Sequence, residues 1–253
     1  MNLLYLTFLF PLLGWLVLAF SIGRLGERSA ALIGVGSIGL SALNTLWVGI
    51  DYFNHISLGN MPEGGVYTQT LWQWMSVGSF TPTFRLALDG LSLTMLGVVT
   101  GVGFFIHLFA SWYMRGEEGY SRFFTYTNLF IASMVFLVLA DDLLFVYLGW
   151  EGVGLCSYLL IGFYYRNPAN GAAALKAFVV TRVGDVFLAI GLFVLYRELG
   201  TLNIHELLVR SPAMFADGSP ALSFACLMLL GGAVGKSAQL PLQTWLADAM
   251  AGP

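Results

Sequence analysis

Long apolar runs separated by short polar segments constrain this chain more than any other feature. Runs of about 20 residues are long enough for a helix to cross a hydrocarbon core about 30 Å thick. Only 10% of the residues are charged and 58% are hydrophobic, whereas soluble domains are about 25% charged. The runs are continuous and do not alternate in polarity, which favours helices over a β-barrel. The sequence therefore predicts an all-α polytopic membrane protein.

The apolar runs predict about seven transmembrane helices. The first run could be mistaken for a signal peptide, but it lacks a basic N-terminal region and a clear small-residue cleavage site, so we expect a retained helix. The expected spans are 3–20, 30–50, 86–112, 123–140, 143–164, 171–196 and one that begins at Ala221. We expect polar connections at 51–85 and 197–220, and a tight turn at Asp141 and Asp142.

Arginines in the connections predict the orientation of the chain, because basic residues concentrate on the cytoplasmic side. An external N-terminus would place five arginines inside and three outside. The inside group is Arg24, Arg28, Arg115, Arg122 and Arg166, and the outside group is Arg85, Arg197 and Arg210. The sequence therefore favours an N-terminus on the outer face.

Several patterns that could suggest a cofactor have simpler explanations. Residues 34–39 read G-x-G-x-x-G, but no strand precedes them and no acid follows at the required distance, so close helix packing explains them better. Cys156 and Cys226 lie in separate spans without a C-x-x-C motif, and we interpret both as buried apolar thiols. No haem, zinc, iron–sulfur or P-loop pattern is present, and no basic stripe indicates nucleic acid. We expect no redox or ATP chemistry on this chain.

Glu151 is the ninth residue of the span that begins at Leu143, which places it about 12 Å along the helix, near the middle of the hydrocarbon core. A carboxylate at that depth is either protonated or paired with a cation. A protonated glutamate bonded within the bundle is the structural alternative. We favour a functional role, because intramembrane acids usually mark ion or proton pathways.

Lys236 lies inside the last apolar run, where a lysine costs about 3 kcal/mol on insertion scales. Burial favours the neutral form of a lysine and a nearby carboxylate favours the charged form, so a movable partner would make it a switchable proton site. A static ion pair is the alternative. Pro241 predicts a helix break near Gln239 or Leu240, and broken helices at membrane depth mark transport sites.

Further charged residues on the sixth span are candidates for the same site. Arg182 and Asp185 are three residues apart and should share a helix face, either as a structural salt bridge or as part of the mechanism. Lys176 lies nearer the inner end and could simply snorkel. Trp245 and Asp248 follow the break and could orient the broken segment or form an amphipathic turn.

Two other polar residues of the apolar spans have mainly structural interpretations. His107 lies near one end of the third span and is interpreted as a packing histidine in preference to a proton relay. Asp89 lies near the other end of that span and could cap its helix.

Five segments resemble the antiporter-like membrane subunits of respiratory complex I, the NADH:quinone oxidoreductase. The strongest are GWEGVGLCSYLLI at 149–161 and GKSAQLP at 235–241. Supporting segments are LDGLS at 88–92, SWYMRGEEGY at 111–120 and AFVVTRVGD at 177–185. The resemblance runs over the whole chain, which would cover the first seven helices of such a subunit, less than half of its length.

The resemblance implies a fold of two inverted five-helix repeats, each with a broken helix. It assigns residues 1–122 to an N-terminal three-helix region with a long outer loop, and residues 123–253 to an incomplete first repeat. Glu151 matches the key glutamate of the family, Lys236 matches the key lysine on broken helix seven, and Arg182 with Asp185 matches the polar pair on helix six. The rest of the fold would lie beyond Pro253.

The favoured function is therefore that of a proton-translocating membrane-arm subunit in the bacterial inner membrane, in which Glu151 modulates Lys236. The resemblance implies neighbouring antiporter-like subunits as partners, and FMN, iron–sulfur clusters and quinone on other subunits. One alternative is a subunit of a multisubunit cation/proton antiporter, which shares these motifs. A second is a scaffold whose ion pairs are purely structural. The sequence leaves open whether Glu151 and Lys236 touch.

Overall fold

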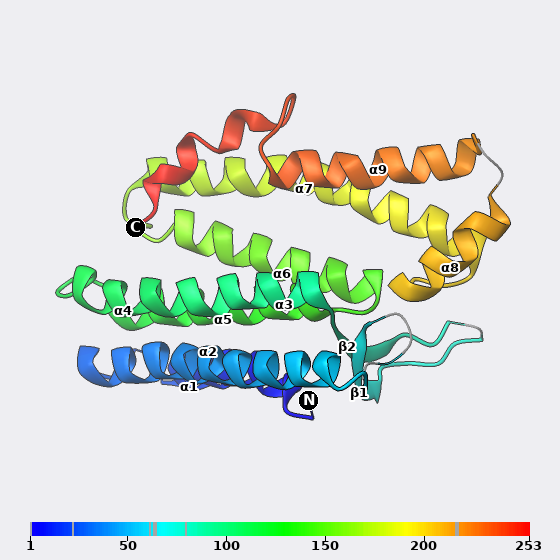
Figure 1. The fold of residues 1–253 in the computed structure, drawn as a ribbon. Coiled ribbons are helices and arrows are strands. Elements are labelled where there is room, and N and C mark those ends of the chain that lie inside the picture. The colour runs from blue at the N-terminus through cyan, green and yellow to red at the C-terminus, as the bar shows by residue number, and fades with distance from the viewer. Residues whose placement is uncertain (1, 22, 61, 63–64, 79, 216–217) are drawn as a thin grey trace. The chain divides into compact units, whose positions relative to one another are not determined.

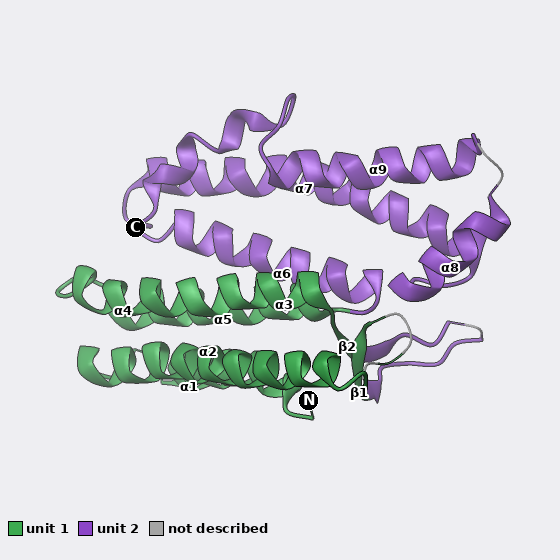
Figure 2. Ribbon diagram, viewed as in Figure 1, with its two compact units in different colours: residues 1–71, 85–140 green, residues 72–84, 141–253 purple. Residues whose placement is uncertain are grey.

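The structure is a computed structural model that describes every residue except 1, 22, 61, 63–64, 79 and 216–217 (Figure 1). It is mostly helical, as predicted, and forms two compact units (Figure 2). Unit 1 comprises residues 1–71 and 85–140, and unit 2 comprises residues 72–84 and 141–253. The predicted boundary after residue 122 marks the start of a structural repeat, whereas these two units are defined by how compactly their residues pack. The two divisions therefore describe different properties of the chain.

Most of the described helices are apolar enough to lie in a membrane. Unit 1 contains α1 (Leu4–Phe20), α2 (Glu27–Ser57), α3 (Gly90–Gly97), α4 (Gly103–Tyr113) and α5 (Tyr120–Leu139). Unit 2 contains α6 (Leu143–Ile161), α7 (Pro168–Leu199), α8 (Ile204–Met214) and α9 (Pro220–Lys236). Among the described residues, five helices have the length and hydropathy of a membrane span, namely α2, α3 continued into α4, α5, α6 and α7, while α1 and α9 are shorter apolar helices.

The third predicted span is one helix with a local irregularity. Between α3 and α4, the segment Val98–Val102 is π-helical. The span begins with a capping box, in which Asp89 Oδ1 accepts from the Ser92 N–H and the Ser92 hydroxyl accepts from the Asp89 N–H, each at 2.7 Å. The predicted capping role of Asp89 is therefore confirmed, and it satisfies amide groups that a helix N-terminus otherwise leaves unpaired.

Glycines bring the helices of unit 1 into close contact. A Cβ on Gly34 would lie 2.5 Å from the Phe124 ring, and one on Gly39 would lie 3.1 Å from the Phe104 ring. The interpretation of the 34–39 motif as helix packing is thus confirmed at these two glycines. On the same helix, Thr45 accepts a hydrogen bond from Thr100 at 3.1 Å.

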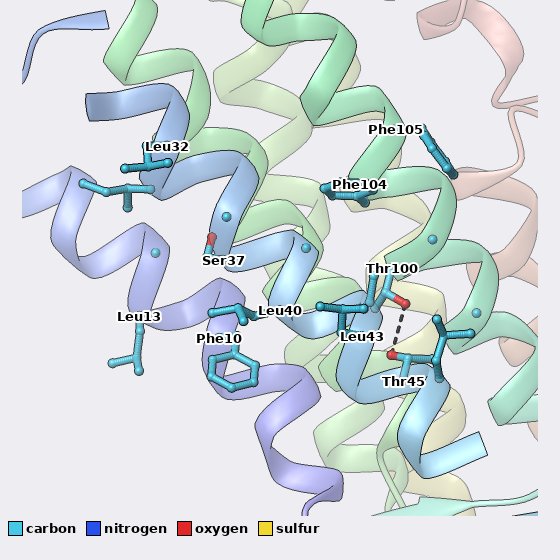
Figure 3. Close-up of a pocket in the computed structure, with 18 of the residues that line it drawn as sticks. Phe10, Leu13, Leu32, Ser37, Leu40, Leu43, Thr45, Thr100, Phe104 and Phe105 are labelled. Carbon is cyan, nitrogen blue, oxygen red and sulfur yellow. Dashed lines mark hydrogen bonds between the residues drawn. The ribbon is translucent and has the colours of Figure 1, made fainter. Parts of the chain in front are cut away.

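Unit 1 contains an apolar cavity of about 960 Å³. It is lined by residues of α1, α2 and the α3–α4 span (Figure 3). Leu13, Leu40 and Phe105 are typical of its lining, and its few hydroxyl groups include the bonded pair Thr45 and Thr100. None of the described residues that line it is ionisable. The candidate proton-carrying residues therefore lie elsewhere.

The predicted polar connection between residues 51 and 85 contains regular structure. Helix α2 continues to Ser57, and a two-stranded sheet follows, formed by β1 (Tyr67–Gln73) and β2 (Thr83–Leu88). Trp72 stacks on Phe84 with ring centroids 4.4 Å apart, an aromatic cross-strand pair of the kind that stabilises hairpins. The all-α prediction is therefore wrong here, because pairing between the two strands orders part of a connection for which we predicted no regular element.

The second polar connection also contains an element that we did not predict. Helix α8 is capped by Asn203, whose side chain accepts from the Glu206 N–H and donates to Asp141. Its Leu207 packs in a buried cluster with Leu195 and Leu199 of α7. The helix forms because an apolar contact and a cap outweigh the polar character of the surrounding sequence.

Helices α7 and α9 pack more extensively than any other pair of elements in unit 2. A Cβ on Gly184 of α7 would lie 2.9 Å from the Cα of Gly235 on α9, and a Cβ on Gly191 would lie 2.9 Å from the Leu229 side chain. Such close approach requires a small residue on at least one side of the contact. Figure 1 shows the two helices running side by side.

Candidate functional site

Lys236 is the last residue of α9, so the helix ends three residues before Gln239. The predicted break near Gln239 or Leu240 is therefore placed too late in the chain. Ala238 already has a positive φ of 49°, and the Gln239 N–H reaches back to the Val234 carbonyl at 3.0 Å. A cation at this end of the helix is favoured by the partial negative charge of its free carbonyl groups.

The carboxylate nearest to Lys236 among the described ion pairs belongs to Asp185. Its Oδ2 lies 3.8 Å from Lys236 Nζ, and the side chains are 2% and 19% exposed, respectively. Asp185 directly follows Gly184, and Lys236 directly follows Gly235. The close contact between these two glycines therefore brings Asp185 and Lys236 to the same level of the helix pair. The backbone packing of α7 and α9 therefore creates this ion pair.

Glu151 of α6 pairs with Arg182 of α7, not with Lys236. The sequence left open whether Glu151 and Lys236 touch, and within the described residues each has a different partner of opposite charge. The Arg182 guanidinium also lies 4.5 Å from the centre of the Phe178 ring, where a cation–π contact is favourable.

Arg182 and Asp185 face the same side of α7, as their spacing predicted, with 3.8 Å between the guanidinium and Asp185 Oδ2. Asp185 Oδ2 therefore lies 3.8 Å from two cations, Arg182 and Lys236. The four ionisable side chains form a row of alternating charge that runs Glu151, Arg182, Asp185, Lys236. When all four are charged, the row is neutral, and loss of one proton leaves an excess negative charge at low dielectric.

Trp150 belongs to this site, although the sequence reading did not select it. Its indole N–H donates to Asp185 Oδ1 at 2.6 Å, and its ring centre lies 5.7 Å from Lys236 Nζ. The position of Trp150 in the sequence could have identified it. Tryptophans of membrane helices concentrate at the interfaces, whereas Trp150 lies seven residues after Leu143, the first residue of its span.

Lys176 is not part of the row of charges and pairs instead with Asp248 at 2.6 Å, with both side chains 44% exposed. Trp245 Nε1 donates to the Gly235 carbonyl at 3.1 Å. Of the two interpretations offered for Trp245 and Asp248, these contacts favour the one in which they orient the segment after the break. That segment turns away from α9 and returns to the start of α7 (Figure 1).

Three other residues considered from the sequence lie away from the row. His107 is buried in unit 1, with its Nδ1 2.8 Å from the Gly103 carbonyl, in keeping with a packing role. Cys156 is buried as expected, but Cys226 of α9 is exposed, so its interpretation as a buried thiol is wrong. Within the described residues, no group of three or more His, Cys, Asp or Glu side chains is placed to hold a metal ion.

Two protein-family models match the chain. A model described as "NADH:quinone oxidoreductase/Mrp antiporter, TM" matches residues 140–253. A model described as "NADH-Ubiquinone oxidoreductase (complex I), chain 5 N-terminus" matches residues 74–124. The first match includes all four residues of the charged row.

Curated relatives align with all or most of the chain. The proteins named NADH-quinone oxidoreductase subunit L from Pseudomonas aeruginosa and from Escherichia coli (strain K12) are each 70% identical to it over 253 residues. A subunit L from Mycobacterium tuberculosis is 46% identical over 185 residues, which is 73% of this chain. The chain spans 40% of the length of the first two relatives.

Solved structures share the fold. The Mrp complex from Dietzia sp. DQ12-45-1b contains a chain that is 27% identical, with a TM-score of 0.75 over 99% of this chain and 25% of that one. An archaeal membrane-bound sulfane sulfur reductase contains a chain that is 17% identical, with a TM-score of 0.80 over 100% of this chain and 48% of that one. The second likeness concerns the fold alone.

Proposed function

Because this chain belongs to the family of antiporter-like membrane subunits of NADH-quinone oxidoreductase, with the subunit L proteins among its relatives, we propose that it takes part in proton translocation by that complex. The observation that carries the proposal is the row of Glu151, Arg182, Asp185 and Lys236, of which Asp185 is buried and the other three are partly buried. Such groups are costly at membrane depth and mark proton pathways.

The chain is a multi-pass protein of the bacterial inner membrane. We propose seven crossings, made by the five long apolar helices together with α1 and α9. The proposed fold is the front part of an inverted-repeat antiporter, in which residues 123–253 form the incomplete first repeat and residues 1–122 the preceding three-helix region. The helix end at Lys236 corresponds to the broken helix of that repeat.

The row of charges suggests how a conformational or electrostatic change elsewhere reaches Lys236. Arg182 stands between two carboxylates, those of Glu151 and Asp185. If the Glu151 pair weakens, Arg182 is free to bind Asp185 more closely, and Asp185 then compensates Lys236 less. A lysine with a weaker partner in a low-dielectric site gives up its proton more readily. In this way Glu151 modulates Lys236 through two intermediates.

The redox reaction itself is assigned to other subunits. We propose that FMN, iron–sulfur clusters and quinone are bound by partner subunits of the complex, and that the chain contacts a neighbouring antiporter-like subunit and the lipid bilayer. It would then act in an enzyme, an NADH:quinone oxidoreductase translocase, without carrying a redox centre.

The proposal is tested by Lys236→Ala and Glu151→Gln, each introduced into the full complex. NADH-driven proton pumping is measured in membrane vesicles, and assembly is checked on a native gel. We expect pumping to fall while the complex stays assembled. Normal pumping in both variants would overturn the proposed role of the row and would favour the scaffold alternative.

A second candidate function is that of a subunit in a stand-alone cation/proton antiporter. The likeness to a chain of the Mrp complex favours it, since 27% identity accompanies a TM-score of 0.75. The two candidates differ in their partners. Co-purification of the tagged chain with NADH dehydrogenase subunits is expected for the respiratory complex, whereas an antiporter would be isolated without them.

A further inference from the structure

We propose that Trp150 is a positioning residue for Lys236, because it fixes one oxygen of the Asp185 carboxylate and leaves the other oxygen to the two cations. This inference rests on the proposed function of Lys236 in proton translocation. It concerns a side chain that is not ionisable and that acts through its neighbours.

Among the contacts of Asp185 that the structure describes, the hydrogen bond from Trp150 is the shortest. It measures 2.6 Å from Nε1 to Oδ1, as short as charge-assisted hydrogen bonds become. Within the described residues, Asp185 Oδ2 accepts no hydrogen bond, and its two cationic neighbours stay at 3.8 Å. The indole thus anchors the carboxylate, while the cations interact with it only through charge.

The same indole also faces the cation. Lys236 Nζ lies 5.7 Å from the ring centre, within the range of cation–π attraction. One edge of Trp150 therefore binds the anion and one face approaches the cation. Trp150 packs against the buried cluster of Leu188, Leu192 and Leu202.

Anchoring matters because Asp185 has a competing partner on its own helix. Arg182 lies one turn away on α7, and a guanidinium can bind both oxygens of a carboxylate at once. A carboxylate free to rotate would satisfy Arg182 in this way and would turn away from Lys236. Because the indole N–H binds Oδ1, only Oδ2 of Asp185 faces Arg182 and Lys236. Lys236 therefore keeps Asp185 as a partner, but one whose interaction can be weakened.

The test uses Trp150→Phe in the full complex, which retains an aromatic ring and removes the N–H group. We expect NADH-driven pumping to fall by about tenfold, the scale set by losing a hydrogen bond to a charged group, with assembly intact on a native gel. Trp47→Phe is the matched control, because Trp47 is exposed on α2 in unit 1. Pumping equal to that of the control would overturn the inference.

A double-mutant cycle separates positioning from general packing. If Trp150 acts through Asp185, adding Trp150→Phe to Asp185→Asn should reduce pumping no further. Losses that multiply would overturn the inference, because they would show that Trp150 acts independently of Asp185. Should Asp185→Asn abolish pumping, the same cycle is measured from the thermal inactivation rate of NADH–quinone activity.

A second substitution covers the case in which Trp150→Phe does not assemble. Benzothienylalanine at position 150 keeps the bicyclic shape and replaces the N–H by sulfur, so it removes only the donor. Unchanged pumping with this residue would overturn the inference. If Lys236→Ala abolishes pumping in the same assay, the proposed function stands whatever the result for Trp150. Failure of the Trp150 inference can therefore be distinguished from failure of the proposed function.

Discussion

Lys236 and Asp185 face each other across the contact between α9 and α7, with 3.8 Å between Nζ and Oδ2. Asp185 is almost completely buried. It is also the nearest described carboxylate to Lys236, so removing its charge would leave the ammonium group without its nearest negative charge. Glu151 influences the lysine from further away, because it is paired with Arg182. The order of these partners yields the first prediction.

Asp185→Asn should impair proton pumping more than Glu151→Gln does. The first change removes the direct partner of Lys236, and breaking a buried ion pair on one side costs about 3–5 kcal/mol. The second leaves Lys236 its partner and affects it only through Arg182. Pumping in vesicles, normalised to assembled complex, measures both effects. A larger loss with Glu151→Gln would contradict the order of the row.

Gly154→Ala should displace the ammonium group of Lys236. A Cβ at this position would lie 2.7 Å from Nζ, which is too close for the present position of the side chain. The flexible lysine can move, so we expect reduced pumping with little loss of assembly. Gly171→Ala is the control, because a Cβ there meets nothing within 4 Å. Equal pumping in the two variants would show that Lys236 tolerates other positions.

Gly184→Ala should instead impair folding and assembly. Its Cβ would lie 2.9 Å from the Cα of Gly235, and backbone cannot move aside as a lysine can. Overpacking of this kind costs about 1–3 kcal/mol. The yield of assembled complex and its thermal inactivation temperature should both fall. Gly97→Ala, where a Cβ has open space, is expected to match the unmodified protein.

Lys176→Ala should have only a small effect on stability. The ion pair with Asp248 is partly exposed, and exposed ion pairs contribute about 0–1 kcal/mol. Its effect on pumping should be modest and should act through the position of the segment after α9. The double variant Lys176→Asp with Asp248→Lys, in which the two charges are exchanged, should pump more protons than either single variant. Failure to restore it would indicate that the pair does not orient the segment.

The sequence determined the class of the protein and most of its elements for simple energetic reasons. A chain with such long continuous apolar runs cannot cover a water-facing surface. In lipid, the backbone N–H and C=O groups must hydrogen-bond to one another, so these runs form helices. Single charges inside those runs identified Glu151, Arg182, Asp185 and Lys236 as candidates, since each is costly unless it has a partner or a function. The cap at Asp89 was also predictable, because a short polar side chain preceding an apolar run is a local signal.

Only the tertiary structure decided which charges are partners. Side-chain type and spacing could not distinguish Glu151 from Asp185 as the partner of Lys236, because the answer depends on how closely α7 and α9 approach. That distance is set by Gly184 meeting Gly235, a contact between residues far apart in the chain. The same packing brings the Trp150 indole to Asp185. Helix α8 and the β1–β2 sheet were likewise decided by burial of Leu207 and by the stacking of Trp72 on Phe84, contacts that exist only after folding.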